Sequence, residues 1–187
     1  MIAWALRLLF LLTLTAIACS DSKSPEIVPP KIEIEQLYLF DVYYANGAWG
    51  YVLTGTYVDN QGNVVSYDHS FARWIPENRY SLTIEELSEK YIAPLDTIAH
   101  VDEETLYDMY NLIEEASLGE LSEGEQTGFD MGLFLYVCYK YDDDTDRYIQ
   151  VLLSKTGDYT QTNLSDAAIE LTDWLNAVLA DARDKRK

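Results

Sequence analysis

The sequence predicts an α+β fold, in which a mostly antiparallel sheet has helices packed on one side in the order βββ-αα-ββ-α. Aromatic and β-branched residues surround clear turn signals in the first part of the domain. Two segments with helical spacing of apolar residues follow, and then two apolar runs joined by an acidic turn. The chain ends in a long segment with helical periodicity.

The first three strands are expected between residues 32 and 74, as a meander. Asn46 and Gly47 divide QLYLFDVYYANGAWGYVLTGTYV, and Asn-Gly indicates a hairpin because both residues tolerate the positive φ of a type I′ turn. The segment DNQGN, residues 59–63, predicts a second turn. VVSYDHSFARW then predicts the third strand.

Two helices are expected next. In SLTIEELSEKYI, Thr83 is the expected N-cap, and Glu86 stands three residues later, which is the spacing of a capping box. In DEETLYDMYNLIEEASLG, Asp102 or Thr105 begins the helix and Gly119 stops it. Acidic residues in the first turn of this second helix favour the positive end of its dipole.

The last part of the chain predicts a hairpin and a long helix. FDMGLFLYVCYKY is apolar on both faces, as expected for a central strand, and the acidic segment 142–146 turns the chain into RYIQVLLSK. Asn163 or Ser165 caps the helix in NLSDAAIELTDWLNAVLADARDKRK. How the hairpin pairs with the meander is left open. The helix is expected to complete the core with an apolar stripe made of Leu164, Ala168, Leu171, Leu175, Val178 and Ala182.

Composition limits the function classes. The chain of 187 residues has a net charge of −19, which disfavours nucleic acid because phosphates require Lys and Arg. Hydrophobic residues make up 48%, so a domain over residues 31–187 is expected to fold without metal or disulfide. Cys138 lies in an apolar run and is expected to be a buried, inert thiol.

The N-terminus has the layout of an export signal. Arg7 precedes an apolar run that begins at Leu8, and small residues stand just before Cys19. The segment is too short for a membrane span, which needs about 20 apolar residues. Residues 16–19, AIAC, resemble the lipobox of bacterial lipoproteins, with alanine in place of the more usual leucine at its first position.

The lipoprotein resemblance covers residues 1–20 and has consequences for processing and location. It implies that the signal peptide, residues 1–18, is removed and that Cys19 receives lipid, including acyl chains such as palmitate. Residues 19–30, with their Ser, Asp and Pro, then form a tether. Ser20 after the cysteine implies the outer membrane, facing the periplasm, or the inner or plasma membrane where that sorting rule does not apply.

Catalytic and metal motifs are weak. His69 stands between Asp68 and Ser70, but neighbours in a strand point to opposite faces, so no triad is expected. His100 precedes the second expected helix, near its cap. The paired acids Glu85-Glu86, Glu103-Glu104 and Glu114-Glu115 are interpreted as solvated helix faces. Asp142, Asp144 and Asp146 alternate like calcium ligands, yet the EF-hand positions that need Gly and Glu hold Arg147 and Leu153. We expect a plain acidic turn there, with weak calcium binding as the alternative.

The function expected from these features is a non-enzymatic, membrane-anchored binding, inhibitor or immunity-type protein with no cofactor. Its acidic, Tyr-rich surface would hold a basic envelope protein. The alternatives are a glycan- or cell-wall-binding module and an enzyme of unfamiliar type. The glycan alternative depends on aromatic residues that crowd the first hairpin, namely Tyr43, Tyr44, Trp49, Tyr51 and Tyr57.

Overall fold

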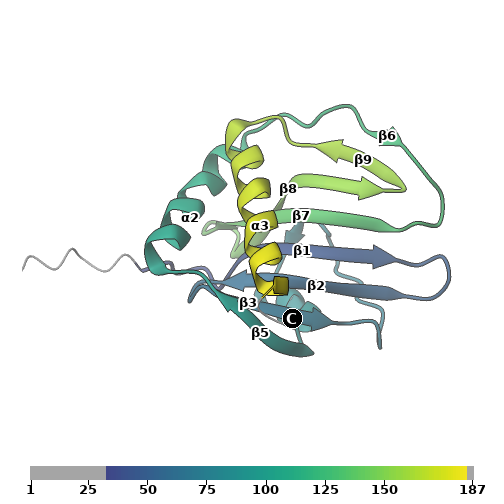
Figure 1. Cartoon of the computed structure of the whole chain (residues 1–187), viewed down its shortest axis with the longest axis horizontal. Helices are drawn as coiled ribbons and strands as arrows, with labels where there is room; N and C mark the ends of the chain where they lie inside the picture. Colours follow the sequence, from purple (N-terminus) through teal and green to yellow (C-terminus); the bar gives the residue numbers. More distant parts are fainter. Residues whose placement is uncertain (1–32, 185–187) are drawn as a thin grey trace, which may run out of the picture. The chain divides into compact units, whose positions relative to one another are not determined.

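The structure, a computed structural model, describes residues 33–184, so Cys19 and the rest of the expected lipoprotein signal and tether lie outside the described residues. Strands dominate the described chain and form an antiparallel sheet in the order β5-β3-β2-β1-β7-β8-β9-β6 (Figure 1). β4 lies off this path and pairs with β8. The strands are β1 (Tyr38–Asn46), β2 (Val52–Asp59), β3 (Asn63–Asp68), β4 (Ser81–Leu82), β5 (Pro94–His100), β6 (Glu125–Gln126), β7 (Leu133–Asp142), β8 (Arg147–Gly157) and β9 (Tyr159–Thr162).

The predicted meander and hairpin are joined through their central strands. β1, β2 and β3 pair in sequence order, and β7 pairs with β8 across the acidic turn, as expected. β1 also pairs antiparallel with β7, with Phe40 opposite Cys138. This pairing makes one continuous sheet, and it confirms the α+β class with a mostly antiparallel sheet.

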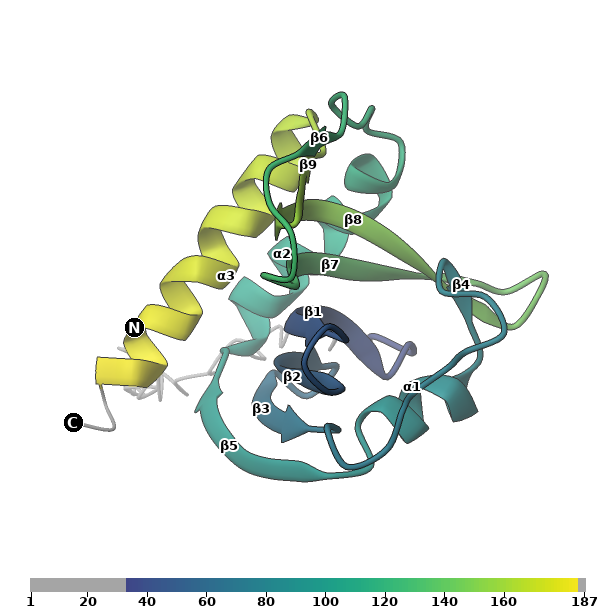
Figure 2. The same cartoon turned by 90° about the vertical axis from the view of Figure 1, so that its right-hand side faces the viewer.

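The helices cover both faces of the sheet. α2 (Glu103–Ser117) and α3 (Asp166–Asp184) share one face, as expected. The short α1 (Ile84–Lys90) packs on the opposite face, on which no helix was expected (Figure 2). The reason lies in β7, where Cys138 faces the α2 and α3 side while Val137 and Tyr139 face the other. A strand that is apolar on both faces needs a cover on each.

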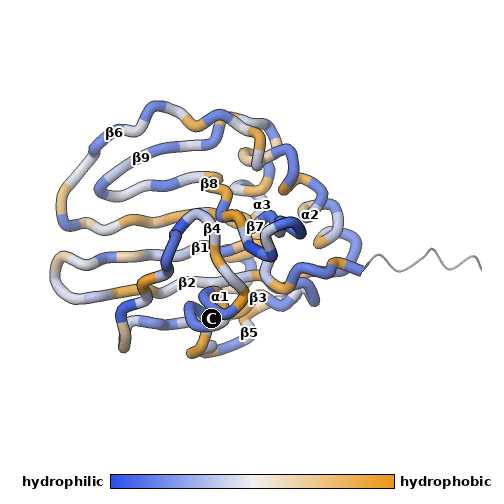
Figure 3. Tube along the Cα trace, turned by 180° about the vertical axis from the view of Figure 1, so that it is seen from behind, coloured by the Kyte–Doolittle hydropathy of each residue, from blue (hydrophilic) through white to orange (hydrophobic). Residues whose placement is uncertain are grey.

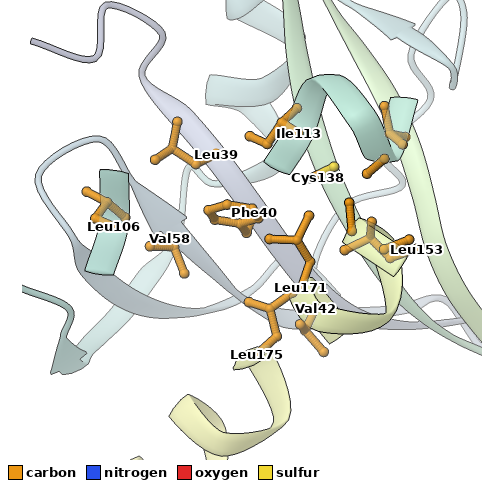
Figure 4. Packing of buried hydrophobic residues seen from close by; sticks show 14 of the residues in the cluster. Leu39, Phe40, Val42, Val58, Leu106, Ile113, Cys138, Leu153, Leu171 and Leu175 are labelled. Atoms are coloured by element: carbon orange, nitrogen blue, oxygen red, sulfur yellow. The ribbon is translucent and has the colours of Figure 1, made fainter. Parts of the chain in front are cut away.

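The core beneath α2 and α3 is almost entirely apolar. Phe40 and Val42 of β1 meet Leu171 and Leu175 of α3, and Cys138 of β7 lies among them (Figure 4). Much of β7 is hydrophobic (Figure 3), as expected for a strand that has a core on each face. The expected role of the last helix in the core is therefore confirmed.

The helix caps form as the sequence predicts. Thr83 Oγ1 accepts a hydrogen bond from the amide of Glu86 at 3.2 Å, and Glu86 Oε2 accepts one from the amide of Thr83 at 2.8 Å. Asp102 caps α2 by accepting from Thr105. Ser165 Oγ accepts from the amide of Ala168 at the start of α3. Local chemistry thus sets where each helix begins.

Several finer expectations are wrong. The first hairpin has no two-residue Asn-Gly turn, because residues 47–51 connect the strands and the positive φ belongs to Gly50. Asn46 instead accepts a hydrogen bond from the amide of Ala48, which holds the longer loop. Leu164 is 57% exposed, since it precedes the first turn of α3 and Ala167 is buried instead. β4, β5, β6 and β9 were not predicted; they are short or highly exposed.

Candidate functional site

The second face of the sheet buries an ion pair that the sequence pattern did not indicate. Asp41 of β1 and Lys90, the last residue of α1, lie with Nζ 2.6 Å from Oδ2, and both side chains are 0% exposed. Asp41 alternates with Phe40 and Val42, which belong to the other core, so the strand directs its carboxylate toward α1. Lys90 follows Leu87 by three residues and thus shares the buried stripe of α1.

Tyrosine hydroxyls surround the Asp41 carboxylate. Tyr91 donates to Oδ2 at 2.8 Å, Tyr67 approaches both oxygens at 3.2 Å, and Tyr139 lies 3.4 Å from Oδ2. The three come from different elements: β3, the C-cap of α1 and β7. Every acceptor oxygen of the buried carboxylate therefore has a donor, which is the condition for keeping a charge out of water.

Aromatic rings complete the site around the ammonium group. Lys90 Nζ lies 3.7 Å from the centre of the Tyr43 ring and 5.1 Å from that of Trp74. Both are within the distance at which a ring face attracts a cation. Trp74 is fixed by its indole N–H, which donates to the carbonyl of Glu86 in α1. We name the set of Asp41, Lys90, Tyr43, Tyr67, Tyr91 and Tyr139 the tyrosine cage.

Burial controls the protonation of the cage. It lowers the pKa of Lys90 below its ordinary value, against the opposing attraction of Asp41. It also raises the pKa of Tyr67, Tyr91 and Tyr139 well above the usual value, and the negative charge of Asp41 adds to that effect. The hydroxyls thus stay protonated at neutral pH and are available as donors to Asp41.

A glycine makes room for the cage. A Cβ atom at Gly55 in β2 would lie 2.6 Å from Cβ of Tyr43 and 2.8 Å from the hydroxyl of Tyr67. Any larger residue would displace one of these two tyrosines. This signal is present in the sequence, in GTY, but its meaning depends on which residues β1 and β3 place opposite β2.

The hairpin aromatics do not form one surface. Tyr43 is in the cage, Tyr57 packs on Tyr91 at 4.3 Å between ring centres, and Tyr51 packs against the same core. Tyr44 donates to the carbonyl of Met131 across a loop. Trp49, at the end of the hairpin, is 87% exposed.

The two histidines lie at opposite ends of β3 and are not brought together either. His69 is buried, and neither ring nitrogen has a hydrogen-bond partner within residues 33–184, so it does not contact Asp68 or Ser70 in the manner of a triad. The amide of Ser70 donates directly to Asp68, and hydrogen bonds from Ser70 lower the pKa of that carboxyl. His100 ends β5, on an exposed edge. Cys138 is buried as expected.

A surface groove does gather several of the expected acidic residues. It has a volume of about 740 Å³ and opens between the C-terminal end of α2 and strands β7 and β8. The acidic residues 142–144 line it together with Leu118 and Leu121, which are 76% and 45% exposed. Lys140 also lines it, but its charge is paired with Glu114, with Nζ 2.6 Å from Oε2. We name this feature the acidic groove.

The turn at the acidic groove is held by its own side chains. Asp142 accepts hydrogen bonds from the amide of Asp144 and from the hydroxyl of Thr145, and Asp146 accepts from the hydroxyl of Tyr141. Asp143 and Asp144 are exposed. No group of three or more His, Cys, Asp or Glu side chains among the described residues converges as metal ligands would.

A second groove, of about 790 Å³, lies between the end of α3 and the sheet. It is lined by Tyr44, Phe134 and Leu179 and contains both Arg183 and Asp184, so it carries no single sign of charge. No helix in the described part of the chain is long and apolar enough to cross a membrane.

Comparison of the chain with family models, with curated proteins and with solved structures found no match. What the domain binds must therefore be argued from the two features above. The tyrosine cage is closed to solvent, and the acidic groove is open to it.

Proposed function

We propose that the protein is a lipid-anchored binding protein of the bacterial envelope, which holds or blocks a basic protein partner and is not an enzyme. The acidic groove carries this proposal. It combines three adjacent aspartates, residues 142–144, with exposed Leu118 and Leu121. A partner segment with Lys or Arg beside an apolar residue matches that combination, because apolar contact supplies affinity and complementary charge supplies association rate and specificity.

The end of α2 strengthens the preference for a cation. The C-terminal end of a helix carries a partial negative charge, which basic residues usually offset. α2 has no basic residue in its last turn, and the groove opens beside Ser117 and Gly119 at that end. The net charge of −19 adds a long-range attraction for a basic protein.

The role of the acidic groove in binding can be tested with variants that remove the charge of its aspartates but keep the size of the side chains. Full-length lipidated protein and the double variant Asp143→Asn/Asp144→Asn are used to capture partners from the native envelope. The matched control is Glu103→Gln/Glu104→Gln, which removes the same charge at the opposite end of α2. We expect a basic protein that binds the wild type and the control, but that the groove variant and raised salt release. Equal capture by all three proteins would contradict the proposal.

The anchor is a separate part of the proposal, supported by the lipobox resemblance. Substitution Cys19→Ser removes the thiol that would accept the lipid, so we expect unprocessed precursor and no incorporation of labelled fatty acid. Serine at position 20 favours the outer membrane as the location. A variant that is still cleaved, labelled and membrane-bound would show that Cys19 is not the anchor.

Glycan binding is the second candidate, and exposed Trp49 is the observation that favours it. A flat exposed indole can stack on a sugar ring. Titration with cell-wall glycan fragments separates the two functions, because glycan binding should depend on Trp49 and be unaffected by salt. Binding lost in Trp49→Ala but retained in Asp143→Asn/Asp144→Asn would favour the glycan over the basic partner.

A further inference from the structure

The tyrosine cage brings together the two reactants of an amide bond. Lys90 Nζ and Asp41 Oδ2 are 2.6 Å apart in a site with no solvent exposure. An ammonium–carboxylate pair and an amine–carboxylic acid pair differ by the transfer of one proton between them. A dry interior makes charge costly, so the neutral pair, in which the lysine is a nucleophile, is closer in free energy to the ion pair than it is in water.

We propose that Lys90 and Asp41 become joined by an intramolecular isopeptide bond after the domain folds, which ties α1 covalently to β1. This site lies on the opposite face from α2, and the proposal does not depend on the function of the acidic groove.

The reaction needs no other reactant. One proton passes from Lys90 Nζ to the Asp41 carboxylate, and the neutral amine attacks Cγ. The Nζ–Cγ bond forms and the bond from Cγ to the protonated oxygen breaks. That hydroxyl leaves with one amine proton as water, so the amide nitrogen keeps one hydrogen. The net charge of the pair is zero before and after, and no electron is gained or lost.

The surrounding tyrosines are placed to assist this attack. As Nζ adds to Cγ, negative charge develops on a carboxyl oxygen, and fixed donors stabilise such charge most strongly where water is excluded. Tyr67 lies 3.2 Å from Oδ1, on which that charge develops. Tyr91 donates at 2.8 Å to Oδ2, the oxygen that receives the Lys90 proton and leaves as water. Tyr43 holds the lysine from the other side, with its ring centre 3.7 Å from Nζ. Burial lowers the pKa of Lys90, which raises the amine fraction.

The product also resolves an energetic problem of the site. A buried ion pair bears the desolvation cost of two charges, whereas an amide bears none of it. The bond would close a loop between residues 49 apart in sequence, and a closed loop limits the conformations of the unfolded chain. A protein exposed at the cell envelope would thereby resist unfolding and proteolysis.

Tryptic digestion of the denatured full-length protein tests the bond directly. Cleavage sites leave Asp41 in the fragment 32–73 and release Lys90 at the end of the fragment 80–90. An isopeptide bond blocks cleavage after Lys90. We therefore expect fragment 32–73 joined to fragment 80–140, with a mass one water below their sum. Recovery of all the Lys90 in the linear fragment 80–90 would overturn the proposal.

Two variants test the chemistry of the cage. Lys90→Arg keeps the positive charge but removes the amine, so the joined fragments should disappear. Tyr91→Phe should lower the joined fraction several-fold, because it removes the closest hydroxyl donor, and Tyr80→Phe is the matched control at an exposed tyrosine. A joined fraction equal in wild type, Tyr91→Phe and Tyr80→Phe would refute the assisting role of Tyr91.

Discussion

The two faces of the sheet are built on different principles, although the same central strands supply both. The face beneath α2 and α3 is filled by aliphatic side chains, Phe40 and Cys138. The face beneath α1 is filled largely by tyrosines around the Asp41–Lys90 pair. On the first face stability comes from apolar area and close packing. On the second face a charge and several hydroxyls must also be satisfied within the core.

The difference between the faces follows from the size of the helices that cover them. α3 is 19 residues long and buries a stripe that includes Leu171 and Leu175. α1 has 7 residues and buries only Leu87 and Lys90 within its helical span. A single turn or two cannot seal a sheet with aliphatic side chains, so the large rings of Tyr43, Tyr67 and Tyr139 fill the space.

The largest effect is expected from breaking the ion pair. Lys90→Met should lower the free energy of unfolding by about 3–5 kcal/mol, because it leaves the carboxyl group of Asp41 buried without its partner. The double variant Asp41→Leu/Lys90→Met should recover part of that loss, since both charges are gone. Denaturant melts measure both quantities. If the double variant is no more stable than Lys90→Met alone, the cost does not come from the unpaired carboxylate.

Substitutions in the apolar core beneath α3 should lower the free energy of unfolding nearly as much. Leu171→Ala and Leu175→Ala are each expected to lower the free energy of unfolding by about 2–5 kcal/mol, because each leaves a cavity beneath α3. Asp173→Ala, on the exposed face of the same helix, should cost less than about 0.5 kcal/mol. Equal, small effects from both kinds of variant would indicate that α3 does not complete the core.

A larger residue beside the tyrosine cage should lower the free energy of unfolding by an intermediate amount. Gly55→Ala places a Cβ within 2.6 Å of Tyr43 and is expected to cost about 1–3 kcal/mol, the usual range for overpacking. Gly47→Ala is the matched control, because no atom lies within 4 Å of a Cβ at that position. Thermal melts of the two variants should differ clearly. Similar melting temperatures would mean that Tyr43 and Tyr67 can move to accommodate the added Cβ at little cost.

The smallest effect is a difference in how stability depends on pH. The pKa of Tyr67 is raised in the folded state, so above the ordinary tyrosine pKa of 10.0 the unfolded chain loses this proton first and stability falls as pH rises. The lowered pKa of Lys90 acts in the opposite sense, but only below its ordinary value of 10.5. Above pH 10.5 the remaining pH dependence therefore comes from the buried tyrosines and from Cys138, because burial also raises the pKa of its thiol.

Variants of single tyrosines show whether the loss of stability above pH 10.5 comes from the tyrosine cage. Tyr67→Phe should reduce the loss of stability above pH 10.5 by up to about 1.4 kcal/mol per pH unit, the value for one proton. Tyr80→Phe, at an exposed position, should leave the slope unchanged. The free energy of unfolding from denaturant melts at several pH values gives the slopes. A slope that is the same in all three proteins would show that Tyr67 ionises equally in both states.

Local chemistry made much of the fold predictable. The capping box at Thr83 and Glu86, the cap at Asp102 and the periodicity around Leu171 need only neighbours within one or two helical turns. The missed strands illustrate the limit of that reasoning. β4 and β6 have two residues each and exist because β8 and β9 offer them partners. No periodicity can be seen in two residues.

The candidate sites were predictable to different degrees. The acidic turn at residues 142–146 stands out in the sequence, but its place beside Leu118 and the end of α2 does not. The tyrosine cage gave weaker signals, an aspartate in the middle of an apolar strand and a lysine on the apolar stripe of α1. Each is common as an exposed charge, so neither indicates a buried site by itself.

The α+β class, the meander, the central strand and the approximate start of each helix can be predicted from the sequence alone, because turns, caps and apolar periodicity are local. The pairing of β1 with β7 and the position of α1 on the second face depend on tertiary contacts. Those contacts join residues far apart in the chain, as do Asp41 and Lys90, which are 49 residues apart. Their energies depend on burial and on partners supplied by other elements, which no single segment of the sequence specifies.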